Sequence, residues 1–276
     1  MTEMPMHDDS PFYGYNVAAI QEQYVGRGAV GVVDFLLPHV KPGLSVLDAG
    51  CGPGTITQGL AEIAAPGKVI GCDLEPGMVA RAQSLAEGKG LDNLSFQAGN
   101  ILDLPFEDNT FDVVMSCAVT EHLSDPVKAM SELGRVAKKG GVVGITRTDW
   151  SANLFAPACP PAERFIELFQ RGFETQGATM FGGRDLPRML QEAGLTVDPS
   201  SVLIAMNGGY TPGPGNAMVG GWAEWIENLP LFDRVIEEGL TTREELDAMC
   251  AEMREWAAQP GTLAATGGCR VVARKE

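Results

Sequence analysis

The chain has 276 residues, enough for one large α/β domain or for a core with an additional cap. Its hydrophobic fraction of 45% is ordinary for a globular protein. The net charge of −16 disfavours a nucleic-acid partner, because proteins that bind phosphate backbones carry basic surfaces. No apolar run approaches the ~18 residues of a membrane span. The acidic first ten residues do not resemble a signal peptide, so a cytoplasmic location is expected.

The first 40 residues are predicted to form a helical cap. Apolar side chains between residues 12 and 37 are spaced for one or two helices. A cap in this position would lie across a ligand site and help to close it. Tyr13, Tyr15 and Tyr24 lie in this segment and either pack the cap or contact a ligand. Tyr13 and Tyr24 are candidate cofactor contacts, and Tyr15 is a candidate catalytic residue.

Residues 46–55, VLDAGCGPGT, form the first clear motif. An apolar run after Pro42-Gly43 predicts a buried strand that ends at Asp48. Three glycines follow at alternate positions, where a backbone without Cβ turns sharply and lets a ligand approach. Thr55 and Gln58 predict a capping box at the start of a helix that runs to about Ala64. Strand, glycine loop and helix N-terminus together predict a nucleotide site.

The residues of this loop exclude two common classes of nucleotide ligand. A P-loop requires a lysine that this loop lacks, and Thr55 stands where a dinucleotide fingerprint has its third glycine. An acid, Asp48, precedes the glycines, as suits a cofactor with a cationic amine and a sulfonium. A second acid, Asp73, ends the next apolar run about 20 residues later, where a carboxylate can accept from both ribose hydroxyls. These residues favour S-adenosylmethionine (SAM); an NAD-type oxidoreductase is the alternative.

The following elements alternate between helix and strand. A helix should begin at Glu75-Pro76, and Phe96 lies in a short third strand. Residues 111–117 predict a fourth strand, with Ser116 and Cys117 at its cofactor-facing end. A helix should begin at Asp125-Pro126 and end before Gly140-Gly141, and residues 142–146 predict a fifth strand.

The pattern changes after Arg147. Residues 150–161 predict a loop, and residues 195–206 predict a strand. Residues 207–221 are rich in glycine and proline and predict an irregular segment. A last strand is expected around Val271. Helices are expected at about 162–173, 187–193, 216–227 and 242–258. The insertion between the final strands is either a substrate lid or a structural appendage.

Four motifs in order resemble class I SAM-dependent methyltransferases of the ubiquinone/menaquinone C-methyltransferase (UbiE-like) type. They are VLDAGCGPGTIT at 46–57, VIGCDLEPGM at 69–78, GNILDLPFEDNTFDVV at 99–114, and EHLSDP with ELGRVAKKGG at 121–141. The alternation of strands and helices predicts an α/β fold with a doubly wound parallel sheet. The resemblance implies a Rossmann-like sheet of seven strands, mostly parallel, with the last strand antiparallel. We expect one methyltransferase domain: a cap (1–40), a SAM-binding core (41–150) and the remaining strands with lid insertions (151–276).

The resemblance also implies further site residues. Relatives usually have Asp-Ala where this chain has Asn100-Ile101. There the side chain would accept from the adenine amine; a plain turn residue is the alternative for Asn100. The complete set of cofactor candidates is Asp48, Ala49, Gly50, Cys51, Gly52, Asp73, Leu74, Met78, Gly99, Asn100, Ile101, Ser116, Cys117, Tyr13 and Tyr24.

Methyl transfer requires alignment of the acceptor and exclusion of water, and requires a base only where the acceptor must lose a proton. His122 is the candidate for that base, with a structural or cofactor-packing role as the alternative. The expected partner is a small-molecule acceptor, methylated on carbon, nitrogen or oxygen; a homo-oligomer is left open. No metal ligand set is expected. Cys51, Cys72 and Cys117 are either apolar fillers or thiols for arsenite-type chemistry, and a SAM-binding enzyme that does not methylate is a further alternative.

Overall fold

The computed structural model describes residues 28–276. The predictions for Tyr13, Tyr15 and Tyr24, and most of the predicted cap, therefore lie outside the described residues. The chain divides into two compact units. We call residues 28–152, 177–206 and 267–276 the core unit, and residues 153–176 and 207–266 the helical unit. The predicted organisation as one methyltransferase domain stays a prediction.

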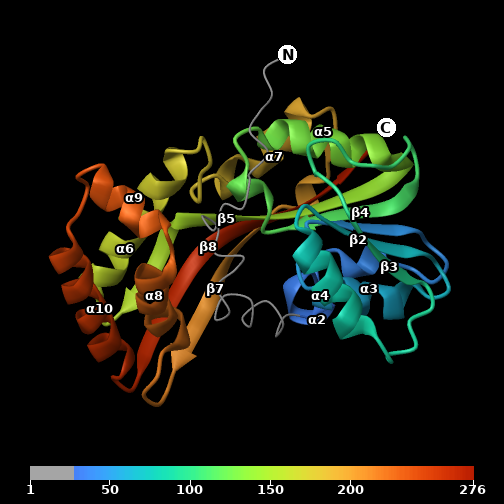
Figure 1. Cartoon of the computed structure of the whole chain (residues 1–276). Coiled ribbons are helices and arrows are strands. Elements are labelled where there is room, and N and C mark those ends of the chain that lie inside the picture. The colour runs from blue at the N-terminus through green and yellow to red at the C-terminus, as the bar shows by residue number, and fades with distance from the viewer. Residues whose placement is uncertain (1–27) are drawn as a thin grey trace. The chain divides into compact units, whose positions relative to one another are not determined.

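The strands form one eight-stranded sheet in the order β3-β2-β1-β4-β5-β8-β6, with β7 paired to β8 (Figure 1). Strands β1 to β5 pair in parallel, and β6 is antiparallel to β8. This order confirms the predicted doubly wound, mostly parallel sheet. The strands are β1 Val46–Ala49, β2 Val69–Asp73, β3 Leu94–Ala98, β4 Phe111–Cys117, β5 Ala137–Ala156, β6 Thr196–Val197, β7 Leu203–Thr211 and β8 Thr262–Arg274.

Helices cover both faces of the sheet in the core unit, as Figure 1 shows. Helices α2 and α3 pack on one face and α5 and α7 on the other, because alternate residues of each strand point to opposite faces. Thus Val46, Val69 and Val113 join the core under α3, whereas Leu47, Ile70 and Val114 join the core under α5. The helices of this unit are α2 Ala29–Val32, α3 Thr55–Ala64, α4 Pro76–Ala86, α5 Pro126–Val136 and α7 Leu186–Glu192, with short 3₁₀ turns η2 Leu37–His39, η3 Thr120–His122, η4 Gly183–Asp185 and η5 Pro199–Ser201.

The helical unit is held together by aromatic side chains. Its helices are α6 Pro160–Glu174, α8 Ala217–Asn228, α9 Leu231–Glu237 and α10 Arg243–Ala257. The Phe165 ring stacks on Trp222 with centroids 4.8 Å apart and on Phe169 at 5.3 Å. Such ring pairs add to the burial of apolar area, so this unit has a core of its own.

Several predicted boundaries are wrong. Strand β5 continues through the predicted loop to Ala156, and β8 is 13 residues long. The predicted strand at 195–206 is divided into β6 and β7 by the turn η5. Strand β7 also extends into the glycine- and proline-rich segment at 207–221, which was predicted to be irregular. Helix α9 was not predicted. Strand pairing is a non-local interaction that overrides the local glycine and proline signals. Within residues 28–276, no helix is long and apolar enough to cross a membrane.

Candidate functional site

The glycine loop follows β1 and leads into α3. Gly50, Gly52 and Gly54 have φ angles of 80°, 52° and 73°, a left-handed conformation that favours glycine. The predicted capping box is wrong: Gly54, not Thr55, is the N-cap, and it makes no side-chain cap hydrogen bond. The reason is that the residue before the helix must be left-handed to complete the turn, a conformation that threonine rarely adopts.

The three glycines differ in what surrounds them. A Cβ on Gly50 would lie 2.3 Å from Cγ2 of Val119, and a Cβ on Gly54 would lie 2.5 Å from the Phe96 ring. Among residues 28–276, no atom lies within 4 Å of where a Cβ on Gly52 would stand. Gly50 and Gly54 therefore allow the loop to pack, whereas Gly52 faces open space where a ligand can approach the backbone.

Asp48 ends up buried behind this loop. Only 1% of its surface is exposed, and its Oδ2 accepts a 2.6 Å hydrogen bond from the Thr57 hydroxyl. The other oxygen, Oδ1, is buried with no hydrogen-bond partner among the described residues. Burial raises the pKa of Asp48 to about 7, the Thr57 hydrogen bond opposes this rise, and the charge of Asp73 adds to it. A buried acid with a spare oxygen suits a cationic group.

Asp73 holds the glycine loop from the end of β2. Its Oδ2 accepts from the Gly52 N–H at 2.8 Å, and its Oδ1 accepts from the Glu75 N–H at 3.1 Å. Burial raises the pKa of Asp73, and these backbone hydrogen bonds oppose the rise. Asp48 precedes the same loop that Asp73 holds, and the charge of Asp73 acts on Asp48. Contact of Asp73 with a ribose stays a prediction.

The neighbouring candidates lie on the loops after β1, β2 and β3. Leu74 is an apolar side chain that is 49% exposed, as a residue lining a ligand site would be. Oδ1 of Asn100 accepts from the Leu102 N–H at 2.9 Å, which is the turn role considered as its alternative. A Cβ on Gly99 would lie 2.7 Å from Cys72 Sγ, so glycine is needed there for packing. Four other candidates are buried near these loops: Ala49, Cys51, Met78 and Ile101.

The end of β4 contributes a second group of polar side chains. Ser116 is 1% exposed, and its hydroxyl has no partner among residues 28–276. The Thr146 hydroxyl donates to Cys117 Sγ at 3.3 Å and lies 3.1 Å from the Ala118 N–H. Ala118 has a φ of 55°, unusual for a residue other than glycine. Strain of this kind often marks functional sites.

His122 lies on the turn η3, which follows β4. Burial lowers the pKa of His122, Glu121 raises it and Arg147 lowers it. The imidazole is therefore mainly neutral at pH 7, the form that can accept a proton.

A buried charged cluster at this edge was missed in the sequence. Arg147 is 1% exposed and donates to the backbone oxygens of Thr120 and Thr179, and Glu121 is also 1% exposed. Asp149 receives two hydrogen bonds from the Arg184 guanidinium, at 2.8 and 2.9 Å. The available signal was a set of charged residues directly after the predicted fifth strand, at its carboxyl end, where ligands bind in such sheets.

The cysteines do not form a soft-metal site. All six thiols are free, and residues 28–276 contain no group of three or more His, Cys, Asp or Glu side chains that could hold a metal ion. Burial raises the pKa of Cys72 to about 12 and that of Cys51 further still. Metal capture requires thiolates, so these residues fit the role of apolar filler.

Comparison with known proteins identifies the same region. A family model described as a methyltransferase domain matches residues 40–194. A protein named "Probable methyltransferase ltbC" from Aspergillus luteorubrus is 28% identical over 282 residues, covering 95% of this chain and 96% of that protein. A demethylmenaquinone methyltransferase from Symbiobacterium thermophilum is 42% identical over 106 residues, covering 37% of this chain and 42% of that protein.

A solved structure adds support for the fold. BH2331 from Bacillus halodurans superposes with a TM-score of 0.61, covering 89% of this chain and 98% of that chain. At 18% identity this likeness shows the fold alone.

Proposed function

The chain belongs to the methyltransferase domain family, and we propose that it moves a methyl group from SAM to a small-molecule acceptor. The observation that carries the cofactor assignment is the buried Oδ1 of Asp48 behind the glycine loop, for which residues 28–276 supply no hydrogen-bond partner. A group with a cationic amine would supply the missing partner. The open space above Gly52 admits a ligand to the loop backbone. The residues present therefore fit SAM.

Each part of the site has a proposed task. Asp48 would hold the ammonium end, and the loop at Gly50 to Gly52 would contact the amino-acid moiety. Asp73 would accept from the ribose hydroxyls, and Leu74, Met78 and Ile101 would contact the adenine. SAM supplies, when bound, a methyl group on a positively charged sulfur that a nucleophile can take by in-line displacement. The buried strand ends limit the access of water to that position.

His122 has two roles open to it at the end of β4. Its lowered pKa leaves a neutral ring that can take a proton from an acceptor that must lose one. An acceptor with a nucleophilic carbon or a neutral amine requires no base. For such an acceptor His122 would only pack near the cofactor, and we favour this role.

The acceptor is proposed to be a small molecule rather than a nucleic acid. The net charge of −16 opposes binding to a phosphate backbone. The relative from Symbiobacterium thermophilum is named for demethylmenaquinone, a quinone and not a nucleic acid, which agrees with this class. That the insertions within residues 151–276 form a substrate lid stays a prediction. A cytoplasmic location and a homo-oligomer remain predictions.

The direct test is to incubate the protein with SAM and a panel of small aromatic and quinone-like compounds, and to measure S-adenosylhomocysteine together with acceptors that gain one methyl mass. We expect both products to form in equal amounts. Calorimetric binding of SAM with a changed acceptor but no S-adenosylhomocysteine would instead indicate a non-methylating enzyme on this scaffold. Binding of NAD but not SAM would refute the cofactor assignment.

A further inference from the structure

A hollow of about 390 Å³ lies at the edge of the core unit opposite the glycine loop. Its lining residues precede or begin the parallel strands: Leu44 comes before β1, Val113 lies near the start of β4, and Val142 lies in the early part of β5. The glycine loop instead follows the carboxyl end of β1. This hollow is therefore separate from the proposed methyl-transfer site.

The hollow is basic although the protein is strongly acidic. Four cations line it, Lys41, Lys138, Lys139 and Arg274, with Asp112 as its one acid, which leaves a formal charge of +3 (4 − 1) with His39 neutral. The whole chain carries −16. Cations gathered in this way repel one another, and an anion between them would relieve that repulsion.

Asp112 and Lys138 in the hollow form an ion pair with each other. Oδ1 of Asp112 pairs with Lys138 Nζ at 2.9 Å, and Oδ2 accepts from the backbone and hydroxyl of Ser45 at 2.8 and 2.6 Å. Lys41, Lys139 and Arg274 form no ion pair with any residue in the described range 28–276. These three cations therefore have no ion-pair partner within residues 28–276, although the charge of Asp198 acts on Arg274 and His39.

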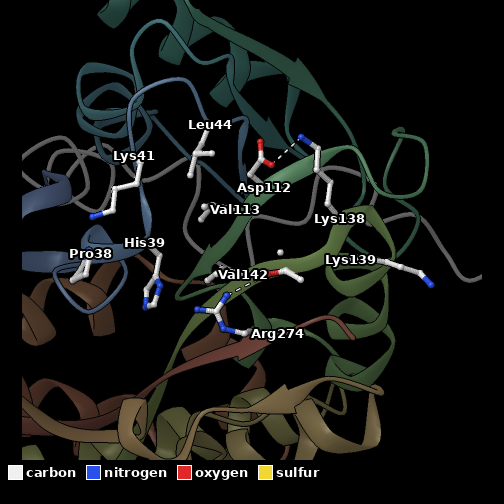
Figure 2. Close-up of a pocket in the computed structure, with 12 residues that line it drawn as sticks. Pro38, His39, Lys41, Leu44, Asp112, Val113, Lys138, Lys139, Val142 and Arg274 are labelled. Atoms are coloured by element: carbon white, nitrogen blue, oxygen red, sulfur yellow. Dashed lines mark hydrogen bonds and ion pairs between the residues drawn. The ribbon is translucent and has the colours of Figure 1, made fainter.

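Figure 2 shows how these side chains lie. Arg274 and His39 lie next to each other below Val142 in this view, and Lys41 and Lys139 lie on opposite sides of the lining residues. Within residues 28–276 the Arg274 guanidinium makes a single long hydrogen bond, 3.3 Å, to the Gly140 oxygen, so donors remain for a ligand. Leu44, Val113 and Val142 supply an apolar floor.

We propose that this hollow binds a small phosphate ester, with the phosphate at Arg274 and His39 and the apolar part on Leu44, Val113 and Val142. A planar guanidinium matches phosphate geometry, and two flexible lysines can reach over the anion. The volume suits a ligand of the size of a phenyl phosphate. A carboxylate-rich peptide is the competing source of negative charge.

His39 gives the proposal a second readout. Burial lowers the pKa of His39, Arg274 and Lys41 lower it further, and Asp198 raises it. A phosphate dianion beside the ring would raise this pKa, so His39 should titrate at a higher pH in the complex than in the free protein.

The test uses the full chain, with phenyl phosphate and inorganic phosphate as probes at constant ionic strength. Calorimetry should show saturable binding of phenyl phosphate, tighter than that of phosphate because of the apolar floor. Lys139→Gln with Arg274→Gln should weaken binding roughly tenfold or more, whereas the exposed Lys128→Gln, which removes one positive charge elsewhere, should not. The NMR signals of His39 should titrate at a higher pH with the ligand present.

Both substituted side chains are exposed, so the double variant is expected to fold, and an unchanged circular dichroism spectrum and melting temperature would verify this. The proposal is overturned if phenyl phosphate shows no binding beyond that of sodium chloride at equal ionic strength. It is also overturned if the double variant binds like the parent, or if a glutamate-rich peptide binds while phenyl phosphate does not.

Discussion

The Thr57 hydroxyl donates a 2.6 Å hydrogen bond to Oδ2 of Asp48, and the Oδ1 of the same carboxyl group is buried without a partner in the described part of the chain. One oxygen is thus held by the first turn of α3, while the other is left for a ligand. The pKa of about 7 follows from this half-satisfied burial.

SAM affinity should rise with pH through about 7, because the cationic amine prefers the ionised form of Asp48, which predominates above its pKa. Asp48→Asn should weaken SAM binding by roughly 10–100-fold and flatten this pH profile, since a charge-assisted hydrogen bond is lost. Calorimetry between pH 5.5 and 8.5 measures both effects. The exposed Asp92→Asn is the matched control. If SAM affinity depended on pH in the same way in Asp48→Asn as in the parent protein, Asp48 would not be the residue that holds the ammonium group.

The same carboxyl should make the ligand-free protein less stable as the pH rises from about 4 to about 7. The folded pKa is raised above its ordinary value, so the folded state holds the proton that the unfolded state releases in this window. The loss should amount to a few kcal/mol. Asp48→Asn should remove it, as urea unfolding at several pH values would show. If the free energy of unfolding of the parent protein did not change with pH in this range, the raised pKa of Asp48 would be contradicted.

Substitutions in the glycine loop should separate packing from ligand binding. Gly52→Ala places a methyl group in open space and should cost about 1–2 kcal/mol through its left-handed φ, while reducing SAM affinity strongly. Gly50→Ala adds a clash with Val119 and should cost roughly 1–3 kcal/mol more. Val119→Ala in the Gly50→Ala background should restore part of that stability, because the clashing methyl groups are removed. Equal stability of the two single variants would show that Val119 does not limit the loop.

Arg147→Met should destabilise the protein by a few kcal/mol. The change leaves the buried Glu121 without the positive charge of Arg147 and deprives the Thr120 and Thr179 oxygens of a donor. Glu121→Gln in the same background should recover part of the loss, and a double-mutant cycle of unfolding free energies measures the coupling. Additive effects would mean that the two charges do not interact.

For His122 the kinetics decide between a base and a packing residue. If it only packs near the cofactor, His122→Ala should weaken SAM binding and leave the rate at saturation nearly unchanged. If it is a base, the rate should rise with pH through a value below 6.5, because the pKa of His122 is lowered, and the mutant should lose roughly 10²–10⁴-fold. Single-turnover rates with saturating SAM measure this. We expect the first result, and a large pH-linked loss of rate would refute it.

The sequence by itself determined the elements whose signals are local. The glycine loop after β1, the strand at 111–117 and the helix capped by Asp125 were all predicted correctly. Their apolar runs, turn residues and caps act within a few positions of each other, so local physical chemistry is sufficient. The placing of Asp48 and Asp73 near one edge also has a simple basis, because parallel strands bring their carboxyl ends to one edge of the sheet.

Only the tertiary structure decided the properties that depend on distant residues. The lengths of β5 and β8 come from pairing across the sheet, and the need for glycine at position 50 comes from Val119, far along the chain. The raised pKa of Asp48 depends on what surrounds the carboxyl group, and the basic hollow collects residues from positions 38 to 274. Burial, charge proximity and packing are set by three-dimensional distance, which the order of residues along the chain does not specify.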